Sequence, residues 1–167
     1  MVPVIEMELV GVRVEMPSSS PIALLREVGG ERRVLPIFIG TPEATAIAFA
    51  LEEVVTPRPM THDLLRNLLD DLGVSLERVS VTELRDGVFH AELLLHGHDG
   101  THTVTSRPSD AIALAARTGS PIFADEDVLA EAGYLEEEPE PDEAPPEEVV
   151  EQFRDFIDSV NPEDFAT

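Results

Sequence analysis

The chain has 167 residues and carries 34 acidic side chains against 11 basic ones, a formal net charge of −23. Every basic residue is an arginine and there is no cysteine, so the composition excludes a uniformly basic nucleic-acid binder, a disulfide scaffold, a zinc finger, an iron–sulfur protein and a thiol nucleophile. No run approaches the ~18 apolar residues that a membrane helix requires, so we expect a cytoplasmic protein with no membrane partner.

The first forty residues predict three strands. In residues 4–16, a set of positions that includes Glu6 and Glu8 alternates with a set that includes Ile5, Met7 and Leu9. This period of two is typical of a strand with one face on the core. Residues 22–28 and 33–39 are predicted as the second and third strands, and Gly29-Gly30 between them is a hairpin signal.

Two helices are predicted next. Thr41-Pro42-Glu43 offers an N-cap, a proline for the first helical position and an acid that favours the helix dipole, and the apolar run that follows extends to Val54. Thr61 is expected to cap a second helix over residues 62–72, which Gly73 ends. Five leucines form one stripe of this helix: Leu64, Leu65, Leu68, Leu69 and Leu72.

The second half of the chain repeats this order of elements. Strands are predicted over residues 79–84, 88–96 and 101–105, with Asp-Gly turns between them. In the second of these turns, Asp99-Gly100, we expect His98 to pair with Thr101. An alanine-rich helix then begins with Pro108 and stops at Gly119, before a short strand at 122–124 and a short helix at 126–133.

The two strand-to-helix junctions are similar. Pro42–Ala48 and Pro108–Leu114 each begin with proline, place an acid in the first turn and continue with small residues. We therefore predict an α+β fold, in which a duplicated strand–strand–strand–helix unit forms a mixed or antiparallel sheet packed by helices.

The negative charge is concentrated at the C-terminal end. Residues 1–124 carry 17 acids and 10 arginines, whereas residues 125–167 carry 17 acids and only Arg154. We expect one domain over residues 1–134, an acidic Pro/Glu linker over 135–148 that buries too little apolar surface to fold, and a C-terminal amphipathic helix and tail over 149–167.

The first candidate site is Thr61-His62-Asp63 at a predicted helix start, close in sequence to Arg58. His62 and Asp63 offer a proton-transfer pair, and Arg58 offers a cation for a phosphate. The alternative is a purely structural helix start, in which the threonine caps the helix and the acid satisfies its dipole.

The second candidate is Ser106-Arg107-Pro108-Ser109-Asp110. Arg107 and the hydroxyls of Ser106 and Ser109, beside free helix N–H groups, have the chemistry to hold a phosphate. The alternative is that Asp110 is itself the negative partner of those N–H groups.

Two sets of residues are candidate metal ligands. Glu43 and Asp110 occupy matching positions in the two units, and with Asp63 they are candidates to hold Mg²⁺ or Mn²⁺ for phosphodiester hydrolysis. The histidine-rich hairpin offers a second set on one strand face, for which a solvated face is the alternative. Its residues are His90, Glu92, His96 and His98.

At these same positions the chain resembles the bifunctional nuclease domain family of bacterial and plant proteins. Three strings carry the resemblance in order: LPIFIG running into EATAIA, RPMTHDLL, and SRPSDAIALA with a following Pro121-Ile122. The resemblance covers roughly residues 4 to 132 and implies an oligomeric α+β domain with nuclease activity on DNA and RNA. Two residues before the arginine of the third string, the family often has an acid, and this chain has Thr105 there. The matching positions that it marks as candidates are Glu43, Arg58, His62, Asp63, Arg107 and Asp110.

Two functions follow from these observations. The first is a nuclease that hydrolyses phosphodiester bonds, in which acids hold a metal ion, Arg58 and Arg107 hold the phosphate and His62 transfers a proton. The second is a non-catalytic oligomeric interaction module whose acidic tail modulates partner binding, because a domain with a net charge of −7 and a tail of −16 repels nucleic acid unless its arginines gather on one face.

Overall fold

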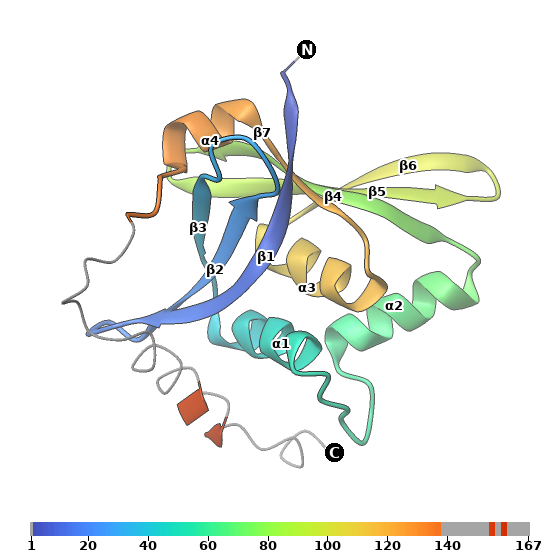
Figure 1. Cartoon of the computed structure of the whole chain (residues 1–167). Coiled ribbons are helices and arrows are strands. Elements are labelled where there is room, and N and C mark those ends of the chain that lie inside the picture. The colour runs from blue at the N-terminus through green and yellow to red at the C-terminus, as the bar shows by residue number, and fades with distance from the viewer. Residues whose placement is uncertain (1, 138–153, 156–157, 160–167) are drawn as a thin grey trace.

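A computed structural model describes residues 2–137, 154–155 and 158–159 of the chain (Figure 1). The elements in this part are β1 (Val4–Glu15), β2 (Ser20–Glu27), β3 (Val34–Phe38), α1 (Thr41–Leu51), α2 (Thr61–Asp71), β4 (Ser75–Arg85), β5 (Val88–Gly97), β6 (Gly100–Ser106), α3 (Pro108–Thr118), β7 (Ile122–Asp125) and α4 (Glu126–Ala132). The predicted α+β class and the repeated order of three strands and a helix are confirmed. Most of the predicted linker and most of residues 149–167, predicted as a terminal helix and tail, lie outside the described residues.

The seven strands of the described residues belong to one mixed sheet with the order β3-β2-β1-β7-β4-β5-β6. Each unit contributes an antiparallel meander, and β7 lies between the two meanders, antiparallel to β1 and parallel to β4. The short strand that comes last in the chain is therefore at the centre of the sheet.

Helices α1, α3 and α2 lie side by side against the sheet, with α3 in the middle (Figure 1). The small side chains at the start of α1 and in the middle of α3 are buried, which lets these two helices pack closely on the strands. One apolar core joins both units, and its fully covered residues include Leu25, Leu35, Ile47, Val79 and Ile112. Among the described residues no helix is long and apolar enough to span a membrane.

The predicted threonine caps are wrong. Gly40 and Met60 hold the N-cap positions of α1 and α2, so that Thr41 and Thr61 are the first helical residues. At α2 the acid of the first turn performs the capping instead, because the Asp63 carboxylate accepts the backbone N–H of Met60 at 3.0 Å. Helix α1 also ends at Leu51, earlier than predicted.

The predicted register of the last hairpin is also wrong. Gly97 pairs with Gly100 and His96 with Thr101, so the turn residues are His98 and Asp99. His98 therefore leaves the strand, and its imidazole ring lies over Gly73. A Cβ atom added to Gly73 would lie 2.9 Å from the Nε2 atom of His98.

The two edges of the sheet differ. At the β3 edge, the backbone N–H and C=O of Val34 pair with Tyr134 at 2.9 Å or less, and Pro36 has no N–H to offer. At the other edge, β6 pairs only with β5 among the described strands, and residues Thr101 to Thr105 are all exposed.

Candidate functional site

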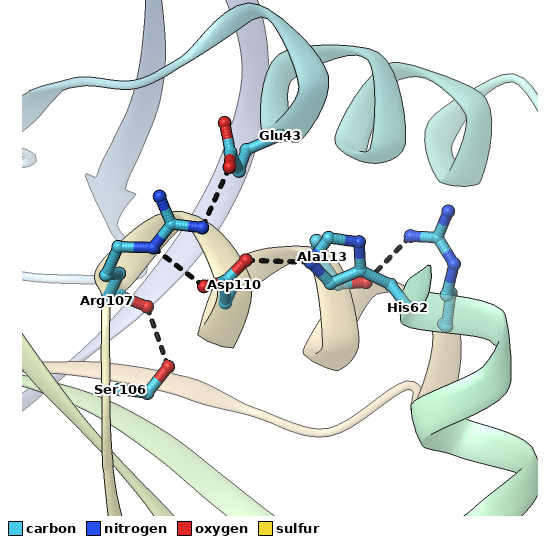
Figure 2. Close-up of polar contacts among 7 residues, drawn as sticks. Glu43, His62, Ser106, Arg107, Asp110 and Ala113 are labelled. Atoms are coloured by element: carbon cyan, nitrogen blue, oxygen red, sulfur yellow. Dashed lines mark hydrogen bonds and ion pairs between the residues drawn. The ribbon is translucent and has the colours of Figure 1, made fainter. Parts of the chain in front are cut away.

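Four side chains from three different helix starts form one continuous hydrogen-bonded chain (Figure 2). The Arg107 guanidinium donates from Nη2 to Glu43 Oε1 at 2.8 Å and from Nε to Asp110 Oδ2 at 2.9 Å. The other Asp110 oxygen, Oδ1, lies 2.9 Å from Nε2 of His62. The order in space is therefore Glu43, Arg107, Asp110, His62.

The backbone at the start of α3 positions Arg107. Arg107 is the N-cap residue and has extended backbone angles (φ −70°, ψ 143°), as expected for a residue held out of the helical region by a following proline. From there its side chain reaches Asp110 one turn on in the same helix and crosses to Glu43 in the first turn of α1. The arginine that precedes Pro108 thus links the start of α3 to the start of α1.

His62 is nearly buried, with 7% of its surface exposed, and is the only buried residue of α2. Its Nε2 atom faces Asp110, whereas Nδ1 has no protein partner among the described residues. Every fully buried side-chain nitrogen or oxygen of the described residues has a hydrogen-bond partner. Because Nδ1 has none, it must be accessible to solvent. An Asp110 carboxylate that accepts from Nε2–H leaves the Nδ1 lone pair available as a base.

Asp110 is held in its charged form. Partial burial acts to raise the pKa of this carboxyl group, but the hydrogen bonds from Arg107 and His62 outweigh burial, so that its pKa lies below the ordinary value. The two carboxylates likewise raise the pKa of Arg107, through the hydrogen bonds that its guanidinium donates to Asp110 first and to Glu43 second. The site thus contains one fixed cation between two acids, with a histidine at one end.

A pocket of about 460 Å³ opens at this chain of residues. His62, Arg107 and Asp110 form its polar wall, and the start of α2, the β5–β6 hairpin and α3 complete it. The remaining lining residues are Thr61, Leu65, Leu93, Thr105, Ser106 and Leu114. Thr105, at the position where the resemblance leads one to expect an acid, is thus part of the lining.

Asp63 belongs to a separate cluster. Its Oδ1 accepts from Nε of Arg117 at 2.7 Å, and the Arg117 side chain is only 5% exposed and also donates to the carbonyl of Ala113. Burial acts to raise the pKa of Asp63, but the bond from Arg117 and the N–H of Met60 together lower it. His62 is therefore paired with Asp110, 48 residues away, and not with its neighbour Asp63.

The other predicted phosphate ligands are dispersed. Arg58 is exposed and does not line the pocket. The Ser106 hydroxyl lines it but donates to the carbonyl of Arg107 at 2.8 Å, and the buried Ser109 lines a different pocket, beside β3 and β5.

The candidate metal ligands do not form a ligand set. In the part of the chain that the structure describes, no three histidine, aspartate or glutamate side chains are close enough to share an ion. Glu43 and Asp110 already accept from Arg107, and Asp63 accepts from Arg117. On the hairpin, His98 sits in the turn while His90, Glu92 and His96 stay on β5. Among the described residues these three acids are therefore each engaged by an arginine, and no set of three ligands converges.

Two arginines with structural roles were not found from the sequence. Arg117 anchors Asp63, as described above. Arg33 donates through Nε and Nη2 to the buried Glu27, and through both Nη atoms to Glu126, which fastens the β2–β3 hairpin to α4. For Arg117 the only local signal was an arginine after an apolar helical stretch, whereas Arg33 directly follows Glu31 and Arg32 and gives no such signal.

Comparison of the sequence with known proteins identifies the family. The family model described as the bifunctional nuclease domain matches residues 23–137, and the chain belongs to that family. Over 163 residues, 96% of this chain and 97% of the relative, it is 47% identical to an uncharacterized protein of Mycobacterium tuberculosis. It is 29% identical over 112 residues to bifunctional nuclease 2 of Oryza sativa subsp. japonica, and 28% identical over 105 residues to bifunctional nuclease 1 of Arabidopsis thaliana. These matches cover 64% and 61% of this chain but only 34% and 32% of the plant proteins.

Proposed function

We propose that this chain cleaves phosphodiester bonds of nucleic acid in the pocket between α2, α3 and the β5–β6 hairpin. The observation that carries the proposal is the pairing of a nearly buried histidine with a charged aspartate, beside an arginine, in the wall of an open pocket. The membership in the bifunctional nuclease domain family supports it.

His62 acts as the base. The Asp110 carboxylate accepts a hydrogen bond from Nε2–H and holds the ring in one orientation, which leaves Nδ1 to take a proton from the attacking oxygen. As the base becomes an imidazolium, the nearby carboxylate stabilises its positive charge. Asp110 is thus a positioning residue that acts through His62.

Arg107 binds the phosphate. Its Nε and Nη2 donors are engaged by Asp110 and Glu43, while Nη1 has no partner among the described residues and 64% of the side chain is exposed. The two carboxylates fix the guanidinium plane, so that the free edge is presented to a phosphate oxygen. They also offset its charge, and we therefore expect weak, salt-sensitive binding of nucleic acid.

This set of groups favours RNA over DNA. In RNA the 2′ oxygen of the ribose is the attacking group: its proton passes to His62 and the 2′ oxygen–phosphorus bond forms. The phosphorus–5′ oxygen bond breaks, the departing 5′ oxygen takes a proton from water, and the hydroxide so formed takes back the proton held by His62. DNA has no 2′-hydroxyl and requires an attacking water molecule, which a single base activates less well. We expect side chains alone to support slow RNA cleavage.

The test is cleavage of matched single-stranded RNA and DNA oligonucleotides by the purified full chain in Mg²⁺, Mn²⁺ or EDTA. We expect RNA cleavage that persists in EDTA and falls about a hundredfold or more in His62→Ala. His90→Ala and Arg58→Ala are matched controls outside the pocket and should retain wild-type activity. Undiminished cleavage by His62→Ala would refute the site, and cleavage only with a metal ion would refute the side-chain mechanism.

One observation favours a second function, a non-catalytic interaction module. Three leucines of α2 and Leu72, which follows the helix as its C-cap, are each 40% exposed or more, and only one residue of the helix is buried. A protein that only binds partners would show this surface and no cleavage of either oligonucleotide under any of the three conditions.

A further inference from the structure

A second pocket adjoins Arg107. Its volume is about 360 Å³, and the end of β3, the start of β5 and the start of α3 enclose it. We call it the Phe38 pocket, after the aromatic residue at its β3 wall. Among the described residues, Arg107 is the one that lines both this pocket and the pocket beside His62. A phosphate held by Arg107 therefore lies where the two pockets meet.

The walls of the Phe38 pocket are largely apolar. Phe38 and Val88 are 63% and 57% exposed, and Phe89 and Pro108 continue the same lining. Large apolar side chains that are exposed together on the wall of one pocket mark a place where a ligand binds. The aromatic ring of Phe38 is the largest uncovered face among them.

The charge of the lining favours an anion. Arg107 is its only charged side chain, and the lining contains no acid although the chain carries 34. Glu43 and Asp110 contact Arg107 but do not line this pocket. Figure 2 shows that the remaining nitrogen of the guanidinium points away from both carboxylates.

One polar side chain of the pocket has no partner. Ser109 is only 6% exposed, and its hydroxyl makes no hydrogen bond to any described residue. Because every fully buried side-chain nitrogen or oxygen in this part of the chain has a partner, the hydroxyl is accessible from the pocket that it lines. A nearly buried hydroxyl without a partner is costly unless something binds it, so that Ser109 is available to a ligand.

We propose that the Phe38 pocket is a nucleobase subsite that binds one base of a single-stranded RNA. The inference rests on the proposed function, because it takes from it the phosphate held by Arg107. Phe38 offers an aromatic face on which a base stacks, and the Ser109 hydroxyl donates to or accepts from the edge of that base. Since every base has a face that stacks, we expect little preference among the four bases.

The chemistry of the proposed cleavage determines which nucleoside enters the pocket. In an in-line displacement the attacking and leaving oxygens lie on opposite sides of the phosphorus. His62 takes the proton of the attacking 2′ oxygen and lines the other pocket, so the nucleoside with that oxygen lies there. The nucleoside of the leaving 5′ oxygen, on the 3′ side of the scissile bond, is therefore the one whose base enters the Phe38 pocket.

Tryptophan fluorescence tests the subsite without cleavage. The chain has no tryptophan, so Phe38→Trp in the His62→Ala chain places a single indole in the pocket. We expect saturable quenching by a single-stranded oligouridylate, and roughly tenfold weaker binding of the same strand in a duplex, because a paired base must first leave its stack. Val28→Trp in the same background is the matched control and should not respond. Val28 is 46% exposed and follows the other end of β2 from the residue that pairs with Phe38.

Each outcome of this titration decides the subsite. RNA that binds in fluorescence anisotropy without quenching the indole at position 38, or that quenches both variants equally, would overturn it. No binding of RNA at all would overturn both the subsite and the proposed function. Quenching at position 38 in a protein whose wild type cleaves neither RNA nor DNA would leave the subsite standing and refute only the nuclease activity.

Removal of the aromatic face should weaken binding only where a base is present. Phe38→Ala should raise the dissociation constant of oligouridylate about tenfold, and Phe38→Tyr should keep the wild-type value. For an abasic ribose–phosphate chain of the same length, the two variants and the wild type should bind equally. Equal losses for both ligands would show that Phe38 acts through the fold or the phosphate contact, and would contradict base stacking.

The position of the base relative to the cleaved bond can be tested in the active chain. A DNA strand with one ribonucleotide has a single bond next to an attacking 2′ oxygen. An abasic residue on the 3′ side of this bond should lower kcat/KM about tenfold in the wild type and have no effect in Phe38→Ala. The same lesion on the 5′ side is the matched control, and a dependence on Phe38 there instead would overturn the assigned orientation.

Discussion

Replacing Asp110 with asparagine keeps the shape of the side chain but removes the charge shared by Arg107 and His62. The Arg107 pair lies largely in solvent, with 64% of the arginine exposed, and contributes about 0–1 kcal/mol to the free energy of unfolding. The bond to His62, whose side chain is 9% exposed, contributes about 1 kcal/mol. We expect Asp110→Asn to lower the free energy of unfolding by about 1–2 kcal/mol at neutral pH.

The pH dependence has a defined sign. The pKa of Asp110 is lowered in the folded protein, so its charge stabilises the fold at pH values above the ordinary carboxyl pKa of about 3.9. That stabilisation is lost as the pH falls through the lowered pKa of the folded state. The difference between wild type and Asp110→Asn should therefore be full at neutral pH and shrink below about pH 4.

Urea unfolding followed by circular dichroism, repeated over this pH range, measures the difference, and RNA cleavage by the same samples measures activity. We expect cleavage to fall about a hundredfold to ten-thousandfold, because His62 loses the carboxylate that orients it. Asp99→Asn is a matched control: it removes an aspartate–histidine contact of 3.0 Å, to His102, at an exposed turn. A stability difference that is independent of pH, or cleavage equal to that of the control, would refute the assigned role.

Three further predictions concern the ion pairs of Arg33, Arg117 and Arg107. Arg33→Met should lower the free energy of unfolding by about 2–4 kcal/mol, because the carboxylate of Glu27, which is 3% exposed, loses its partner. In urea titrations, the double variant Arg33→Met/Glu27→Gln should recover part of this loss, and no recovery would contradict the pairing. Asp63→Asn should lower the melting temperature but leave cleavage per folded molecule unchanged, since Asp63 serves Arg117; a selective loss of cleavage would return Asp63 to the site. In fluorescence anisotropy at low salt, Glu43→Gln should bind a fluorescent RNA roughly fivefold more tightly, because Arg107 is released from one carboxylate. Weaker binding would show instead that Glu43 orients Arg107.

Local patterns were sufficient to predict most of the elements. Helices α1 and α3 each begin with a proline, and α3 ends at Gly119, which has a φ of +71°. These residues start or stop a helix through the backbone within a few positions, so their effect can be predicted from the local sequence. The central position of β7 was not predictable in this way. Its four residues pair with β1 and β4, and nothing within so short a segment specifies partners that distant in the chain.

The partner of His62 illustrates the same limit at the site. The sequence suggested Asp63, the adjacent acid, but consecutive helix residues point about 100° apart and do not face one another. The contact with Asp110 depends on α2 packing beside α3, which brings together two segments 48 residues apart. Both residues were identified as candidates from their own helix starts, whereas their pairing is a tertiary property.

The sheet has one protected edge and one open edge, and this difference limits the size of any assembly built by strand addition. At β3, Pro36 and the bridge from Val34 to Tyr134 leave little for a further strand to bond. Each chain therefore has one end at which its sheet can be extended. Among the described strands, addition of a strand at β6 would leave no second open edge, so that growth by strand addition would stop at a pair and would not continue into a fibre.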